Sequence, residues 1–106
     1  MRPVPASPTR ILLADDHALL RPGLRMILDA EPDLVVVAEA ADGADAVAAA
    51  ARGDVDLAIL DIAMPRMTGI QAAREISRRS PEVRILMLSM YDNEQYYFAA
   101  ARAGAA

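Results

Sequence analysis

The feature of the sequence that most restricts the fold is the apolar run over residues 57–65 (LAILDIAMP), which contains Asp61 and then turns. A short, continuous apolar segment bounded by turn residues is typical of a strand buried on both faces of a parallel sheet. Asp61 then lies at the carboxyl end of this strand, where open α/β sheets bind their ligands. The same residue also suits a turn or a helix N-cap, and this segment alone does not separate the two interpretations.

The composition indicates one small globular domain. The chain has 106 residues, of which 55% are hydrophobic and 25% charged, and no stretch has the length and apolar character of a membrane span. The net charge of −4 argues against nucleic acid as a direct partner. The absence of Cys excludes disulfides and thiolate metal sites and suits a cytoplasmic location. Residues 1–8 are rich in Pro and lack an apolar signal region, so we expect a flexible N-terminal tail.

Apolar runs alternate with segments of helical spacing along the rest of the chain. We expect strands over residues 9–14, 34–40, 57–61 and 84–89, and helices over residues 18–30, 44–52, 69–80 and 93–103. This order predicts an α/β fold with a parallel sheet, right-handed crossovers and helices on both faces. Thr68 is the expected N-cap of the third helix. In the first helix one apolar face is formed by Leu20, Leu24, Ile27 and Leu28.

Acidic residues follow two of the predicted strands. Asp15 and Asp16 come after the first strand, as Asp61 comes at the end of the third. Because the carboxyl ends of neighbouring parallel strands lie together, we expect these carboxylates to converge. Clustered carboxylates repel one another unless a cation lies among them, and oxygen ligands suit a hard ion such as Mg²⁺, which often bridges to phosphoryl groups. Ser89, at the end of the fourth predicted strand, is either a ligand of a phosphoryl oxygen or an ordinary strand-end hydroxyl.

Other polar and aromatic residues allow two interpretations each. His17 is the single histidine, and we interpret it as an exposed loop residue rather than as a metal ligand or phosphate carrier. Consecutive aromatic residues at 96–98 cannot all face a core, so at least one is a candidate for a partner surface. Four arginines could bind an anion, but we interpret them as parts of a solvated helix face: Arg66, Arg74, Arg78 and Arg79.

Three separated motifs carry a family resemblance. Asp15-Asp16 after an apolar strand, the pattern D-x-x-M-P-x-M-x-G beginning at Asp61, and Ser89 after RILML together resemble the receiver domain of bacterial two-component response regulators. The triplet at residues 15–17 and the run YFAAARAGA at 97–105 resemble the branch that precedes a LuxR-type (NarL/FixJ-like) output domain. The resemblance implies a doubly wound, flavodoxin-like (CheY-like) receiver over residues 9–106, with strand order 2-1-3-4 and without the fifth strand and fifth helix.

The resemblance also implies a role for each matching residue. Asp61 corresponds to the phosphoacceptor that attacks the phosphohistidine of a sensor histidine kinase, and Ser89 to the switch hydroxyl. The Mg²⁺ ligands correspond to Asp15 (through water), Asp16, Asp61 and the backbone carbonyl of Ala63. The family further implies a cytoplasmic homodimer that regulates transcription and contacts DNA only through an output domain absent from this chain. Such a domain is not an enzyme, although it assists its own phosphoryl transfer and dephosphorylation.

The sequence departs from the family pattern near its end. Family members have a Lys at the end of a fifth strand, whereas this chain has no Lys and stops at Ala106 before that strand. An alternative hypothesis is therefore a pseudo-receiver, an interaction module that acts without phosphorylation. A haloacid-dehalogenase-like phosphatase is set aside because position 63 is Ala rather than an acid. A dinucleotide-binding enzyme is disfavoured because no G-x-G-x-x-G follows the first predicted strand.

Overall fold

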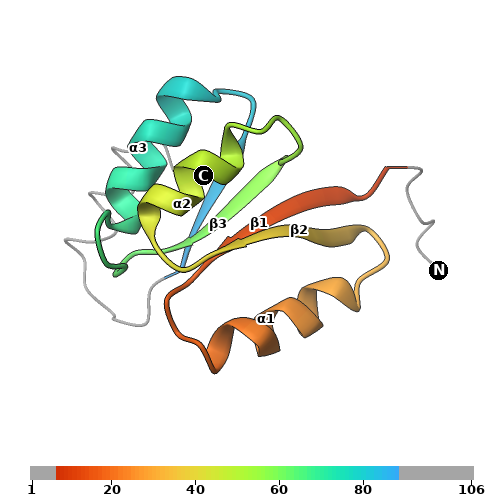
Figure 1. Ribbon diagram of the computed structural model, residues 1–106. Coiled ribbons are helices and arrows are strands. Elements are labelled where there is room, and N and C mark those ends of the chain that lie inside the picture. The colour runs from red at the N-terminus through yellow and green to blue at the C-terminus, as the bar shows by residue number, and fades with distance from the viewer. Residues whose placement is uncertain (1–6, 89–106) are drawn as a thin grey trace.

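The computed structural model describes residues 7–88, and strands alternate with helices throughout this part of the chain (Figure 1). In chain order the elements are β1 (Thr9–Ala14), α1 (Leu20–Asp29), β2 (Leu34–Ala40), α2 (Gly43–Ala50), β3 (Leu57–Asp61), α3 (Gly69–Arg79) and β4 (Arg84–Leu88). The four strands are parallel and form one sheet in the order β2-β1-β3-β4. This confirms the predicted doubly wound fold and its strand order 2-1-3-4. Ser89 and the helix expected over residues 93–103 lie outside the described residues.

Helices cover both faces of the sheet, with α1 on one side and α2 and α3 on the other (Figure 1). Because side chains alternate along a strand, β1 supplies residues to both sides. Leu12 and Ala14 pack into the larger hydrophobic cluster, which lies under α2 and α3. Ile11 and Leu13 belong to the smaller cluster, which faces α1. Burial on both faces explains why the inner strands are continuously apolar in the sequence.

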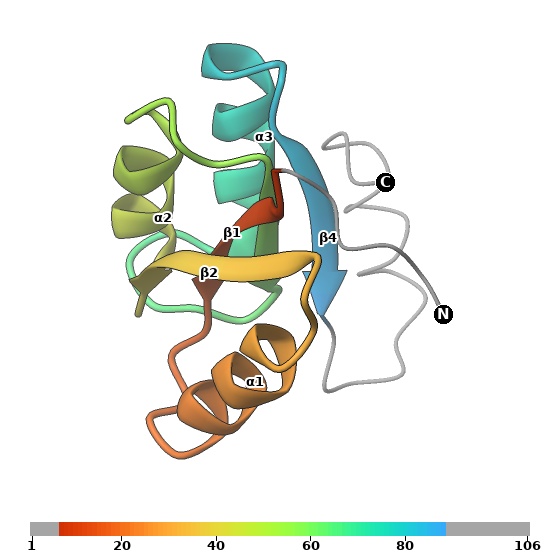
Figure 2. The same ribbon diagram turned by 90° about the vertical axis from the view of Figure 1, so that its right-hand side faces the viewer.

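Among residues 7–88, fewer helices cover the α1 side of the sheet than the other side. Helix α1 packs mainly against β1 and β2, and none of its residues is fully buried. Leu24 and Leu28 contact the smaller cluster, as their spacing predicts, but Ile27 is 67% exposed. Ile27 borders an apolar groove of about 160 Å³ over β3 and β4, to the side of α1. Figure 2 shows α1 beneath β2, with β4 displaced to its side.

The ends of α2 and α3 are fixed by side chains. The hydroxyl of Thr68 accepts a hydrogen bond from the amide of Gln71, and the Gln71 side chain accepts one from the amide of Thr68. This reciprocal capping box confirms the predicted start of α3 and satisfies two amides that the helix itself leaves without partners. At the start of α2, Asp42 accepts a hydrogen bond from the amide of Asp45 at 2.8 Å.

The pairing of β1 with β2 contains one irregularity. Ile11 lies opposite Val36, but the next residue, Leu12, lies opposite Ala38, so Val37 has no partner across the ladder. An extra residue in one strand of a pair is a β-bulge. It occurs in β2, the outermost strand on this side of the described sheet, where the Val37 residue is 38% exposed.

Candidate functional site

The adjacent strands β1 and β3 bring two acidic residues together at their carboxyl ends. Ala14 lies opposite Leu60 in the ladder, so Asp15 and Asp61 follow at the same level of the sheet. Both are buried, with 2% and 3% of their surface exposed. One carboxylate oxygen from each of these residues and from the exposed Asp16 lies within 4.8 Å of the others. The structure therefore brings together the three carboxylates that the sequence predicted to converge.

The two oxygens of Asp61 have different surroundings. Oδ1 accepts a hydrogen bond from the amide of Ala63 at 3.3 Å. Oδ2 is buried and accepts no hydrogen bond from any described residue. Burial raises the pKa of Asp61 above its usual value, and the negative charges of Asp15 and Asp16 raise it further. A buried carboxylate oxygen without a donor is costly, so this position favours a cation.

His17 belongs to this acidic cluster, and its interpretation as an exposed loop residue was therefore incomplete. Its side chain is 49% exposed, but Nδ1 lies 2.6 Å from Oδ1 of Asp15 and 3.3 Å from Oδ1 of Asp16. The same nitrogen lies 3.4 Å from Oδ2 of Asp61. The hydrogen bond with Asp15 and the charges of the three acids raise the pKa of the imidazole. Its position next to the acid pair in sequence was the one available signal.

The donor set suits a divalent cation that prefers oxygen ligands. Three carboxylate oxygens from Asp15, Asp16 and Asp61 are close enough to share one ion, and the unsatisfied Oδ2 of Asp61 faces this cluster. These residues therefore fit Mg²⁺. The amide of Ala63 donates a hydrogen bond to Asp61. The role of the Ala63 carbonyl as a Mg²⁺ ligand stays a prediction. Ser89 lies outside the described residues, so its role also stays a prediction.

The loop between β3 and α3 is folded tightly against the site. The amide of Gly69 donates to the carbonyl of Ile62 at 2.9 Å. A Cβ atom at Gly69 would lie 2.0 Å from the backbone oxygen of Asp61, so only glycine allows this approach. The glycine in the motif that begins at Asp61 thus holds the first turn of α3 against the end of β3.

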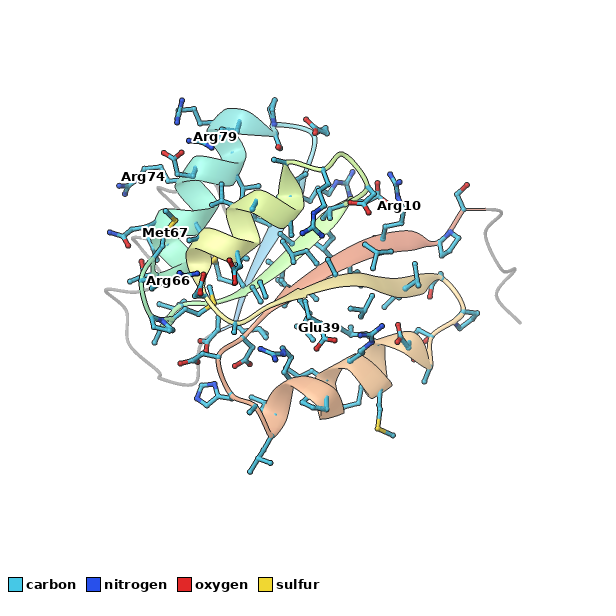
Figure 3. The ribbon with its side chains drawn as sticks, viewed as in Figure 1. Arg10, Glu39, Arg66, Met67, Arg74 and Arg79 are labelled. Atoms are coloured by element: carbon cyan, nitrogen blue, oxygen red, sulfur yellow. The ribbon has the colours of Figure 1, made fainter. Side chains whose placement is uncertain are left out.

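The same loop is tied to the start of α2, through contacts that the sequence did not reveal. Arg66 has a φ of 64°, unusual for a residue with a side chain, and its guanidinium lies 2.6 Å from Asp42 and 3.3 Å from Asp45. The amide of Gly43 donates to the carbonyl of Met67 at 3.0 Å. Figure 3 shows Arg66 and Met67 beside the first turn of α2. Arg66 is therefore a loop residue engaged in ion pairs, and its assignment to a solvated helix face was wrong.

The remaining arginines of the predicted basic set lie on α3. Arg78 and Arg79 contact Glu75 at 2.9 Å and 3.0 Å, and Arg74 is exposed on the same helix (Figure 3). Exposed pairs of this kind contribute little to stability. This arrangement agrees with a solvated helix face. Within residues 7–88, no helix has both the length and the apolar character needed to cross a membrane.

Comparisons with known proteins place these residues in one family. The family model of the response regulator receiver domain matches residues 11–106. Oxygen regulatory protein NreC of Staphylococcus haemolyticus is 44% identical over 97 residues, which cover 91% of this chain and 45% of NreC. The chain spans less than half the length of such curated relatives.

Solved structures show the same similarity. The LuxR-family two-component response regulator from Aurantimonas superposes with a TM-score of 0.87 at 35% identity, covering 93% of this chain and 71% of that one. The CheX-CheY-BeF3-Mg²⁺ complex from Borrelia burgdorferi superposes with a TM-score of 0.84 at 29% identity, covering 93% of this chain and 75% of that one.

Proposed function

Because the chain belongs to the family of response regulator receiver domains, in its LuxR-type branch, we propose that it accepts a phosphoryl group on Asp61 from a sensor histidine kinase. The observation that carries this proposal is the position of Asp61 at the carboxyl end of β3, buried and with Oδ2 free of hydrogen bonds from the described residues. A nucleophile of this kind needs a free oxygen lone pair and a fixed orientation. The hydrogen bond from Ala63 to Oδ1 supports that orientation.

The proposed reaction is one displacement at phosphorus. A carboxylate oxygen of Asp61 forms a bond to phosphorus as the bond from phosphorus to the imidazole nitrogen of the donor histidine breaks. The leaving nitrogen keeps the electron pair and takes up a proton, and Asp61 becomes an acyl phosphate. Such transfers depend mainly on positioning and on electrostatic stabilisation of the phosphoryl oxygens.

Asp15, Asp16 and Asp61 would hold Mg²⁺ at this site, with Asp15 acting through water and the carbonyl of Ala63 as a further ligand. A bound Mg²⁺ offsets the negative charge that accumulates on the transferring group. Support for this ion comes from the acidic donor set and from the similar CheX-CheY-BeF3-Mg²⁺ complex. Ser89, which follows β4 directly, would hydrogen-bond the phosphoryl group. This contact would link phosphorylation to a change at the surface of the domain.

The consequence of phosphorylation would be a change of partner. Relatives such as YxjL of Bacillus subtilis are named transcriptional regulatory proteins, and this chain covers 44% of that protein. We expect a homodimer whose DNA contacts come from an output domain, because the receiver itself is acidic, with a net charge of −4.

A pseudo-receiver is the second candidate, and one observation favours it. His17 contacts all three acids, so its imidazole, when protonated, gives the cluster a positive partner without any ion. In this alternative the site is a structural charge cluster and the domain acts only through its surfaces.

Phosphorylation by a small donor separates the two candidates. The protein is incubated with acetyl phosphate and Mg²⁺, and the modified residue is identified by mass spectrometry. We expect one phosphoryl group on Asp61, none in Asp61→Asn, and normal labelling in Asp54→Asn, which changes an exposed acid outside the cluster. Absence of label in the wild type would favour the pseudo-receiver, and equal labelling of Asp61→Asn would exclude Asp61 as the acceptor.

A further inference from the structure

His17 has no part in the phosphoryl transfer proposed above, yet its ring nitrogen is turned into the site. A half-exposed imidazole is free to point outward into solvent, where its hydration is best. Here Nδ1 lies within 3.4 Å of one oxygen from each of Asp15, Asp16 and Asp61. Four donor atoms, three oxygens and one nitrogen, thus meet within 4.8 Å of one another.

The backbone around His17 fixes this placement. The amide of His17 donates to Oδ1 of Asp15 at 2.7 Å, which folds the loop back onto the end of β1. On the other side, the carbonyl of His17 accepts a hydrogen bond from the amide of Arg21 at 2.9 Å, at the start of α1. The guanidinium of Arg21 donates to the carbonyl of Asp15 at 2.6 Å. Because these hydrogen bonds fix the backbone on both sides of His17, its imidazole is held beside the carboxylates.

The distances from Nδ1 to Asp16 and Asp61 suit ligands of one ion. In an octahedral site with bonds of about 2.1 Å, neighbouring ligand atoms are about 3.0 Å apart. The distances from Nδ1 to the oxygens of Asp16 and Asp61 are 3.3 and 3.4 Å, near this value, whereas the 2.6 Å distance to Asp15 is that of a hydrogen bond. A second observation also points to an ion, because Oδ2 of the buried Asp61, a member of this cluster, accepts no hydrogen bond from the described residues.

The added nitrogen changes which ions the site prefers. Carboxylates alone suit Mg²⁺, whereas imidazole is a good ligand for first-row transition ions. We propose that His17 is a direct ligand, through Nδ1, beside Asp16 and Asp61, which makes this site bind a first-row transition ion such as Co²⁺. The inference rests on the proposed function, in which the same site binds a divalent ion, and it names the residue that sets the ion preference.

Co²⁺ is a suitable probe, because its visible absorption depends on its ligands. We compare the Co²⁺ spectrum and the affinities for Co²⁺ and Mg²⁺, by calorimetry, in the wild type, His17→Ala and the control Asp54→Asn. In His17→Ala we expect a changed spectrum and a loss in Co²⁺ affinity of about tenfold or more, since loss of even a supporting group costs 10–100-fold. The Mg²⁺ affinity should change much less, and Asp54→Asn should match the wild type. Circular dichroism checks that each variant is folded.

Each other outcome overturns the inference in a distinct way. If both ions bind and His17→Ala leaves the Co²⁺ spectrum and affinity unchanged, His17 is not a ligand, while the proposed metal site stands. If His17→Ala binds both ions more tightly, the imidazole competes with the ion rather than binding it. If neither ion binds the wild type, the metal site fails together with the ligand role of His17.

Discussion

The guanidinium of Arg66 lies 2.6 Å from the carboxylate of Asp42, and this ion pair joins the loop after β3 to the first turn of α2. Asp42 is also the N-cap of α2, since its other oxygen accepts the amide of Asp45. One carboxylate therefore serves two elements. The loop that begins directly after Asp61 is held in place by a helix that contributes nothing to the acidic cluster itself.

The Asp42 carboxylate should stabilise the fold only above acidic pH. The amide of Asp45 and the guanidinium of Arg66 lower the pKa of Asp42 below its usual value. As the pH falls through about 4, the unfolded chain takes up this proton before the native protein does, so the contribution is lost on acidification. We expect Asp42→Asn to have a lower Tm than the wild type at pH 7, with the difference shrinking towards pH 3. A difference that stays constant over this range would contradict the role of the charge.

Gly69→Ala should be strongly destabilising, because its Cβ would lie 2.0 Å from the backbone oxygen of Asp61. We expect a loss of about 1–3 kcal/mol or more in the free energy of unfolding, measured by urea denaturation. Gly23→Ala is the matched control, since nothing lies within 4 Å of a Cβ at that position of α1. It should raise stability by up to about 1 kcal/mol, because Ala is the better helix former. Similar losses in both variants would show that crowding at Gly69 is not the cause.

Asp61→Asn should make the protein more stable at neutral pH while removing its proposed function. Burial and two neighbouring acids raise the pKa of Asp61, so the fold bears an unfavourable charge at pH 7, a cost that disappears below its pKa. We expect a gain of about 0.5–2 kcal/mol at pH 7, typical of a single stabilising change. The gain should diminish in acid, as thermal melts at pH 7 and pH 4 would show. A lower Tm for Asp61→Asn at pH 7 would mean that His17 already compensates the charge.

Mg²⁺ at millimolar concentration should raise the Tm of the wild type. An ion that binds only the folded state stabilises it by mass action, by about 2.7 kcal/mol when its concentration is a hundred times Kd. In Asp16→Ala, which removes one exposed ligand of the proposed site, the rise should be much smaller. The measurement is a pair of melting curves with and without Mg²⁺. No shift in the wild type, or the same shift in Asp16→Ala, would contradict a Mg²⁺ site formed by these residues.

The strands and the convergence of the acids could be predicted because both follow from burial. An inner strand covered on both faces must be continuously apolar, and Asp15 and Asp61 at the ends of adjacent parallel strands must then lie together. The start of α3 was predictable for a similar reason, since Thr68 and Gln71 have the spacing of a capping box.

The features that the sequence did not predict concern residues whose neighbours depend on loop geometry or on the placement of a whole helix. The ring of His17 enters the cluster because the loop after β1 folds back onto Asp15. The spacing of apolar residues in the sequence does not predict such a loop conformation. Arg66 adopts a positive φ in the loop before α3 and so reaches α2. Ile27 belongs to the apolar face of α1, but the helix lies over β1 and β2 and leaves this side chain exposed.

The bulge at Val37 affects whether two copies of the protein can pair strand to strand through β2. An outer strand with an unbroken ladder is a template on which a strand from another chain can add, which is one route to aggregation. In β2 the ladder is interrupted halfway, so regular pairing is confined to the short segments 34–36 and 38–40. A bulge also increases the local twist and bends the strand that contains it. One extra valine thus makes this edge of the sheet formed by residues 7–88 a poor surface for strand addition between molecules.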